Sequence, residues 1–133
     1  MTVHDCFVGG ARYIDLAKQP VTLEELSRHP LLMLETASNT RRYIDGWASS
    51  RGVTLNPEVE LGSIDLLLEF AGIGLGIACV VREFAQAELG SGRLREIELV
   101  DPVPPRRVGV VTLKDVGLPV AASRFVDLLM GEV

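Results

Sequence analysis

The sequence is poor in the residues that metal, redox and nucleophilic chemistry require. Its 133 residues include two cysteines, two histidines and one tryptophan, and aromatic residues make up 5%. Cys6 and Cys79 lie in apolar, strand-like segments, where a small buried thiol is a better interpretation than a disulfide or a nucleophile. His4 and His29 have no spacing typical of a metal site, and no serine lies in a nucleophile-elbow pattern. We therefore expect no enzyme activity, no metal and no cofactor.

Long apolar runs and an excess of positive charge are missing as well. Asp65, Glu69 and Arg82 interrupt the most hydrophobic region, so no stretch reaches the roughly 20 residues that cross a bilayer. The N-terminus lacks the basic start and apolar segment of a signal peptide. The net charge of −5 disfavours a general affinity for nucleic acid or anionic membranes. These absences predict a cytoplasmic protein that does not bind DNA through this chain alone.

Short apolar strands and amphipathic helices alternate along most of the chain. Their expected positions are strands at 3–8, 31–34, 58–61, 75–81, 94–99 and 108–113, and helices at 11–18, 22–28, 38–51, 63–73, 82–89 and 119–130. Such alternation predicts βαβ units, a mostly parallel sheet with helices on both faces, and the α/β class. The glycines at 72, 74 and 76 follow a helix and precede a strand, which is the reverse of a dinucleotide-binding loop and indicates a helix stop and a tight turn.

Two of the expected helices begin in hydroxyl-rich segments directly after apolar strands. These segments are Leu31-Leu-Met-Leu-Glu-Thr-Ala-Ser-Asn-Thr40 and Glu58-Val-Glu-Leu-Gly-Ser-Ile64. A helix start has unpaired N–H groups and a partial positive charge, which together hold a carboxylate, sulfate or phosphate. In a parallel sheet both starts open on one edge. The same residue types cap helices without a ligand, so that alternative stays open.

Arg41 and Arg42 follow the first of these helix starts. Cations are mildly unfavourable there because of the helix dipole, so they could serve an anionic ligand or partner. We interpret both as solvated surface arginines.

The order of four motifs resembles the effector-binding domain of LysR-type transcriptional regulators. The motifs are Leu-Glu-Thr-Ala-Ser-Asn-Thr-Arg-Arg, Glu-Leu-Gly-Ser-Ile-Asp, Gly-Ile-Gly-Leu-Gly-Ile, and Gly-Arg-Leu before a proline-rich return. The resemblance covers essentially the whole chain. It implies a fold like that of type II periplasmic binding proteins, in which two α/β subdomains joined by crossover strands enclose a small-molecule effector.

The resemblance also divides the chain into one nearly complete subdomain and part of a second. Residues 31–103 match the second regulatory subdomain, and residues 1–30 and 104–133 match part of the first. Hinge strands are expected near Leu31 and near residues 102–108. Intact members contact DNA through a winged helix-turn-helix that this sequence does not contain, and one wall of the effector cleft is also absent. We therefore expect weak effector binding or none by this chain alone.

The resemblance assigns the ligand-contacting positions and the partners. The positions that match the family's ligand-contacting loops are Thr36, Ser38, Asn39, Thr40, Ser63 and Ile64. The expected partners are a small, anionic effector and a second copy of the chain, since strands 3–8 and 108–113 have lost neighbours and open edges invite pairing. The alternative is a stand-alone solute-binding module of similar fold.

Overall fold

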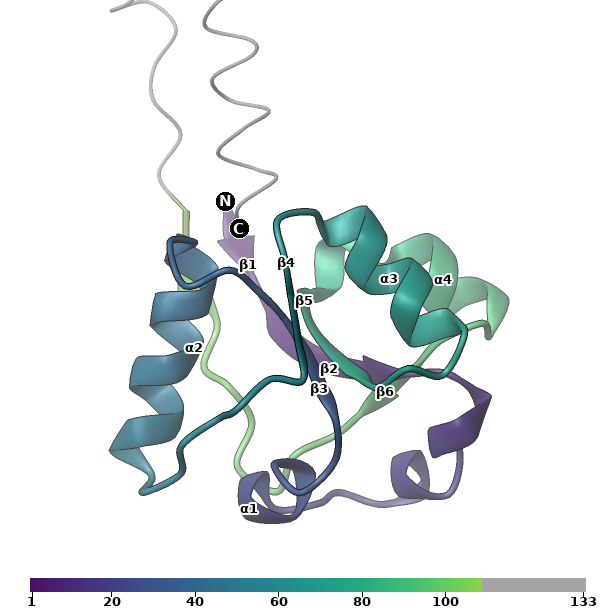
Figure 1. The fold of residues 1–133 in the computed structure, drawn as a ribbon, viewed down its shortest axis with the longest axis horizontal. Coiled ribbons are helices and arrows are strands. Elements are labelled where there is room, and N and C mark those ends of the chain that lie inside the picture. Colours follow the sequence, from purple (N-terminus) through teal and green to yellow (C-terminus); the bar gives the residue numbers. More distant parts are fainter. Residues whose placement is uncertain (109–133) are drawn as a thin grey trace, which may run out of the picture.

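A five-stranded mixed sheet forms the centre of the molecule (Figure 1). The computed structural model describes residues 1–108. The strand order is β4 (Val59–Leu61), β3 (Leu31–Leu34), β5 (Ile77–Val81), β2 (Asp5–Gly9) and β6 (Arg95–Ile97). β3 runs parallel to β4 and β5, whereas β2 runs antiparallel to β5 and β6. The α/β class is confirmed, but the expectation of a mostly parallel sheet is wrong. Because β2 runs antiparallel to both of its neighbours, two of the four strand pairings are antiparallel.

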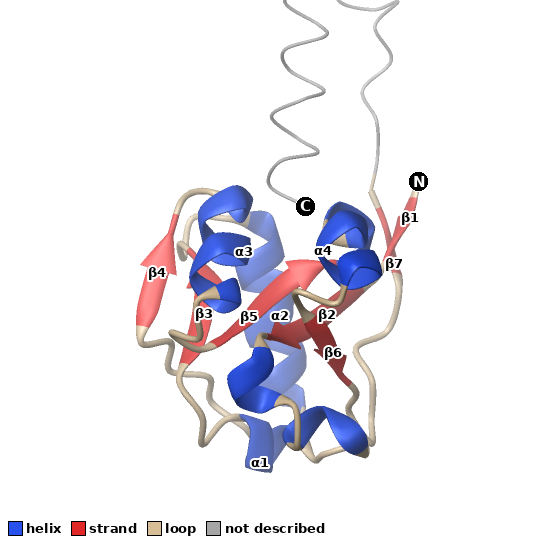
Figure 2. Ribbon diagram, turned by 90° about the vertical axis from the view of Figure 1, so that its right-hand side faces the viewer, coloured by secondary structure: helices blue, strands red, loops and turns tan. Residues whose placement is uncertain are grey.

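Helices cover both faces of the sheet (Figure 2). α2 (Asn39–Ser50) lies on one face, and α3 (Ile64–Gly72) and α4 (Gln86–Ser91) lie on the other, while α1 (Leu23–Leu26) packs below α2. The segment expected as a helix at 11–18 forms two 3-10 turns, Ala11–Tyr13 and Leu16–Lys18, and a third, Arg82–Phe84, precedes α4. No helix within residues 1–108 is long and apolar enough to span a membrane.

The sheet is buried on both faces, which divides the apolar side chains into two main clusters. Alternate residues of each strand face opposite sides. Met33 and Cys79 thus belong to the cluster under α2, and Leu32 and Cys6 to the cluster under α3. The prediction of buried free thiols is confirmed, and the opposite orientations of the two cysteines keep them from forming a disulfide with each other.

The edges of the sheet differ from the prediction. Strand 3–8 was expected to have an open edge, but β2 is hydrogen-bonded on both sides, and β4 and β6 are the outer strands of the described sheet. Leu31, near which a hinge strand was expected, lies in β3, an inner strand of this sheet. Two further short strands, β1 (Thr2–Val3) and β7 (Arg106–Arg107), pair antiparallel with each other and bring the two ends of this region together. In their register Val3 lies opposite Arg106. Apart from residue 108, the expected strand 108–113 and helix 119–130 lie outside the described residues.

The glycine-rich turn between α3 and β5 is confirmed. α3 ends at Gly72, and Gly74 has a φ of +86°, in the left-handed region that favours glycine. A Cβ on Gly76 would lie 2.7 Å from the carbonyl oxygen of Pro30, so this position also has no room for a side chain.

Candidate functional site

The two hydroxyl-rich helix starts lie at the same edge of the sheet, the one formed by the carboxyl ends of the parallel strands β3 and β4, as predicted. β3 and β4 are parallel neighbours, and the backbone N–H of Glu35 donates to the carbonyl oxygen of Leu61 at 3.1 Å, so the pairing continues to the ends of both strands. α2 and α3 then leave this edge toward opposite faces of the sheet (Figure 2). The first turns of both helices therefore border one region.

Ser38 and Ser63 are the N-caps of these helices. The Ser38 hydroxyl accepts a hydrogen bond from the backbone N–H of Arg41 at 3.3 Å, and the Ser63 hydroxyl accepts from the N–H of Leu66 at 3.4 Å. α1 begins in the same way, because Thr22 accepts from the N–H of Glu25 at 3.1 Å. The three caps were readable from the sequence, since Ser and Thr are preferred where a helix begins.

Three of the other predicted positions lie in the same region but are less enclosed by neighbouring side chains. Thr36 and Asn39 are exposed, and the Asn39 side-chain oxygen accepts a hydrogen bond from the guanidinium of Arg42. Ile64 is partly buried and packs against the core under α3. These residues are placed at the predicted edge, but they are not joined into a single polar cluster by the contacts of the described chain.

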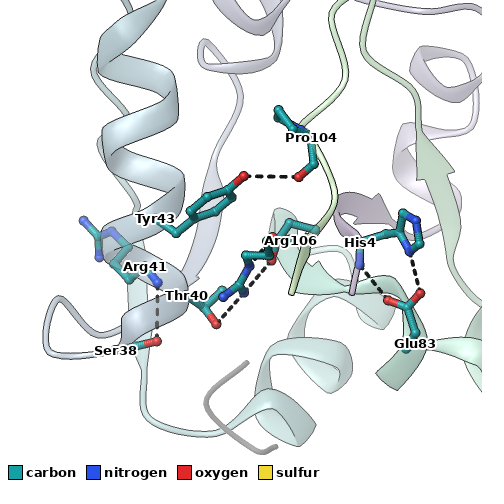
Figure 3. Close-up of polar contacts among 9 residues, drawn as sticks. His4, Ser38, Thr40, Arg41, Tyr43, Glu83, Pro104 and Arg106 are labelled. Atoms are coloured by element: carbon teal, nitrogen blue, oxygen red, sulfur yellow. Dashed lines mark hydrogen bonds and ion pairs between the residues drawn. The ribbon is translucent and has the colours of Figure 1, made fainter. Parts of the chain in front are cut away.

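Thr40 is buried and hydrogen-bonded to a residue that the sequence did not indicate (Figure 3). Its side-chain oxygen accepts from Nη2 of Arg106 at 3.0 Å. The same guanidinium donates from Nε and Nη2 to the two carboxylate oxygens of Asp5, at 2.7 and 2.9 Å. The Asp5 side chain is fully buried. Arg106 and Asp5 are separated by 101 residues, so no local pattern could reveal this pair.

The ring of Tyr43 lies against the guanidinium of Arg106. The Arg106 carbon Cζ lies 5.0 Å from the centre of the Tyr43 ring, and the Tyr43 hydroxyl donates to the carbonyl oxygen of Pro104 at 3.2 Å (Figure 3). α2 is therefore attached to the returning segment 104–107 at two points, one through Thr40 and one through Tyr43.

Arg41 is a buried ion-pair residue, and its interpretation as a surface arginine is wrong. Its guanidinium donates from Nη1 to the carbonyl oxygen of Leu34 at 3.0 Å and to Glu60 at 3.1 Å, and from Nε to Asp45 at 2.9 Å. It thus ties the first turn of α2 to the ends of β3 and β4. The carboxylate four residues later was a usable signal, since i and i+4 side chains meet on a helix. The neighbouring Arg42 is exposed, as predicted.

A second cluster of charged side chains lies beside β2, away from the predicted positions. Glu83 accepts from the backbone N–H of His4 at 2.8 Å and contacts its ring nitrogen at 2.7 Å (Figure 3). Burial raises the pKa of Glu83, but the hydrogen bonds from His4 outweigh it and hold that pKa below its ordinary value. Arg82 makes a two-point contact with Glu96 at 2.6 and 2.9 Å.

His4, Arg82 and Glu96 border a cavity of about 290 Å³ between β2, β6 and the connector before β7, and none of the six predicted site residues lines it. Within residues 1–108, no group of three or more His, Cys, Asp or Glu side chains is arranged to hold a metal ion.

Comparison with known proteins identifies the family. The family model described as LysR substrate binding domain matches residues 6–133. The chain is 31% identical over 112 residues to the uncharacterized HTH-type transcriptional regulator YeiE of Escherichia coli K12, covering 84% of this chain and 38% of that protein.

Among solved structures, the Synechocystis PCC6803 CcmR regulatory domain in complex with 2-PG matches with a TM-score of 0.70 at 18% identity, over 98% of this chain and 62% of that one. The effector binding domain of QuiR in complex with shikimate matches with a TM-score of 0.68 at 10% identity, over 95% and 62%. These neighbours share the fold like that of type II periplasmic binding proteins. The chain spans less than two thirds of each of these proteins, and it belongs to the LysR substrate binding domain family.

Proposed function

We propose that this chain recognises the effector of a LysR-type transcriptional regulator, and that the effector is a small anion held at the starts of α2 and α3. Membership of the family and the transcriptional regulator among its relatives support the regulatory role. The carboxylate-bearing shikimate of the QuiR complex is an effector of the proposed chemical kind. We further propose that the domain performs recognition without catalysis and that the regulator acts in the cytoplasm. A stand-alone solute-binding module has less support from these relatives.

One observation carries the proposal for the site. Two helices of twelve and nine residues begin at the same edge of the sheet, each with a serine cap and with further backbone N–H groups in its first turn. Helix starts of this kind attract anions through their dipole and their N–H groups. We propose Thr36, Ser38, Asn39 and Thr40 as the contacts from α2, and Ser63 and Ile64 as the contacts from α3.

The strand pairing changes the subdomain division that we propose. β2 shares a sheet with β3, β4, β5 and β6, so we assign residues 5–99 to the second regulatory subdomain. The short pair formed by β1 and β7 then provides the crossover strands, and we assign the residues after β7 to the first subdomain. We propose that contact with DNA is made by parts of the regulator outside this chain.

We also propose that the chain forms a homodimer. The outer strands β4 and β6 present backbone groups on which a second chain can pair. Light scattering across micromolar concentrations tests this point: a mass of two chains supports it, and a single-chain mass at every concentration contradicts it.

Calorimetric titration of the 133-residue chain with shikimate, inorganic phosphate and sulfate tests the proposed site. Ser38→Ala and Ser63→Ala each remove a hydroxyl at the site, and we expect each to weaken binding of a positive probe about 5- to 10-fold, which corresponds to the loss of roughly 1 kcal/mol. Thr22→Ala is the matched control, because it removes the same kind of cap from α1 at the opposite end of the sheet. Equal weakening by all three variants, or binding that none of them affects, would place the ligand elsewhere.

A further inference from the structure

We infer that the proline-rich connector between β6 and β7, residues 101–105, is a strap that fastens β7 to α2 and carries a change at the start of α2 to β7. The attachment itself needs no ligand. The transmission rests on the proposed function, because that function places the effector at the start of α2. Tyr43 and Asp101 are the positioning residues of the strap, and both lie outside the proposed ligand contacts.

The first contact of the strap lies at the end of α2. The guanidinium of Arg51 donates from Nε to the Asp101 carboxylate, and its carbon Cζ lies 5.1 Å from the centre of the Trp47 ring. Trp47 is buried in the cluster under α2 together with Val103 of the connector. An ion pair and apolar packing therefore hold the beginning of the connector to the last turns of α2.

Two further contacts lie near the start of α2. The Tyr43 hydroxyl donates to the carbonyl oxygen of Pro104 at 3.2 Å, and Nη2 of Arg106 donates to the Thr40 hydroxyl at 3.0 Å (Figure 3). The connector thus runs alongside α2 in the opposite direction. An extended chain covers about 16 Å in the five steps from residue 101 to 106, and a helix rises about the same distance from residue 40 to 51. The equal lengths allow all three contacts to form together.

The connector follows the helix more closely than it follows the sheet. Pro102, Pro104 and Pro105 have no N–H group and cannot donate to a strand ladder, and each proline also favours an extended conformation in the residue before it. Between the connector and the strands β2 and β6 lies the cavity of about 290 Å³, which Pro102, Val103 and Pro105 line from the connector side. Side-chain contacts with α2 are therefore a main attachment of this segment.

The strap ends at a short and weakly held strand. β7 is two residues long and pairs with the two residues of β1, and the backbone N–H of Val108 directly after it donates to the carbonyl oxygen of Met1 at 2.8 Å. A two-stranded ladder of this size is marginally stable by itself. If opening of β7 also lifts the connector from α2, the contacts of Tyr43 and Asp101 contribute to the free energy of that opening.

Tyr43→Phe releases the strap near the start of α2. It removes the hydroxyl that binds Pro104 and keeps the ring beside Arg106. Tyr13→Phe is the matched control, because the Tyr13 hydroxyl is buried and has no hydrogen-bond partner within residues 1–108. Both variants lose one phenolic oxygen from the same side of the sheet, but the connector loses a contact in Tyr43→Phe alone.

Asp101→Ala releases the strap at the end of α2 by breaking the ion pair with Arg51. Glu69→Ala is the matched control, because it breaks the ion pair with Arg93 on the other face of the sheet. The two carboxylate side chains are 63% and 60% exposed, so the two pairs are screened by solvent to a similar degree.

Hydrogen exchange of the 133-residue chain, followed by NMR, measures the opening of β7 without a ligand. We expect the Val108 amide to exchange about 5-fold faster in Tyr43→Phe, about 2-fold faster in Asp101→Ala and about 10-fold faster in the double variant, as fits the loss of one hydrogen bond and one exposed ion pair. Arg106 stays paired with Asp5 in these variants, so β7 is loosened and not lost. In both control variants the Val108 rate should stay within about 1.5-fold of that of the natural chain.

The amide of Ile77 provides the reference for global unfolding. It donates to the carbonyl oxygen of Pro30 at 2.8 Å within the sheet, and we expect it to exchange at least about 10-fold more slowly than Val108. Equal rates for the two amides in the natural chain would mean that β7 opens only with the whole fold, and they overturn the inference. So does a Val108 rate that neither strap variant changes, or one that the controls change as much.

The second measurement repeats the Val108 exchange with phosphate, sulfate or shikimate, whichever binds in the calorimetric titration. We expect a bound probe to slow Val108 exchange about 5-fold in the natural chain, at the lower end of usual coupling between sites, and less than about 1.5-fold in the double variant. Equal slowing in both chains, or none in the natural chain, overturns the transmission through the strap. If no probe binds, the proposed function fails and the transmission fails with it, while the ligand-free rates still decide whether the strap exists.

Discussion

Replacing Arg41 by alanine tests the conclusion that this residue is a structural tie at the start of α2. Arg41 and Arg42 are neighbours in sequence with the same side chain, yet Arg41 is 6% exposed and Arg42 is a surface residue. The pair thus offers a perturbation and its control within one helical turn. We expect Arg41→Ala to be strongly destabilising and Arg42→Ala to be nearly neutral.

The size of the effect follows from the contacts of Arg41. Loss of the hydrogen bond at 3.0 Å leaves the carbonyl oxygen of Leu34 without this donor, which costs about 1–3 kcal/mol in a buried position. The side chains of Asp45 and Glu60 are 40% and 44% exposed, so each ion pair contributes at most about 1 kcal/mol. The two lost methylenes add up to roughly 1.6 kcal/mol, and the better helix propensity of alanine offsets a few tenths. We expect a loss of about 3 kcal/mol for Arg41→Ala and less than about 0.5 kcal/mol for Arg42→Ala.

Urea unfolding followed by circular dichroism at 222 nm measures both values. A loss of about 3 kcal/mol lowers the midpoint by roughly 1–2 M urea if the slope is unchanged. Arg41→Lys should recover part of the loss, because the cation remains while the forked contacts do not. If the free energies of unfolding of Arg41→Ala and Arg42→Ala agree within about 0.5 kcal/mol, burial and hydrogen bonding of Arg41 do not stabilise the fold in the way described.

Two further predictions concern the cysteines and the glycines. Burial raises the pKa of Cys6 from 9.0 to about 12, so the thiol ionises earlier in the unfolded chain, and stability that is fully present below pH 9 is lost as pH rises toward 12. Urea titrations at pH 8 to 11 should show that this group lowers the free energy of unfolding by about 1.4 kcal/mol per pH unit above pH 9. Cys6→Ala should make this dependence on pH shallower, and an unchanged dependence would contradict the assignment. Gly46→Ala, in the interior of α2 with no atom within 4 Å of the added Cβ, should raise the free energy of unfolding by about 0.5–1 kcal/mol. Gly76→Ala should lower it, because the added Cβ meets a backbone carbonyl at 2.7 Å; a melting temperature equal to that of the natural chain would refute the close approach.

The sequence predicted the helix starts well, because their causes are local. Ser38 and Ser63 each lie directly before an apolar helical pattern, and a cap needs only the N–H groups a few residues later. The apolar strands that precede both helices were also predictable. Their parallel pairing follows from the helix between them, which returns the chain to the same edge of the sheet.

The direction of β2 and the contacts of Thr40 were not predictable in this way. β2 pairs with β5 and β6, which lie about 70 to 90 residues further along the chain, and no residue pattern within β2 distinguishes a parallel from an antiparallel neighbour. The hydrogen bonds of Arg106 to Asp5 and Thr40 likewise join segments 101 and 66 residues apart. These contacts depend on the path of the returning segment, and that path is a property of the assembled fold.

The antiparallel pairing of β1 with β7 has a topological consequence. Thr2 lies opposite Arg107, so the chain enters and leaves the five-stranded region at adjacent points. A unit with adjacent entry and exit acts as a cassette: it can be spliced into a surface loop of a host fold without stretching either flank.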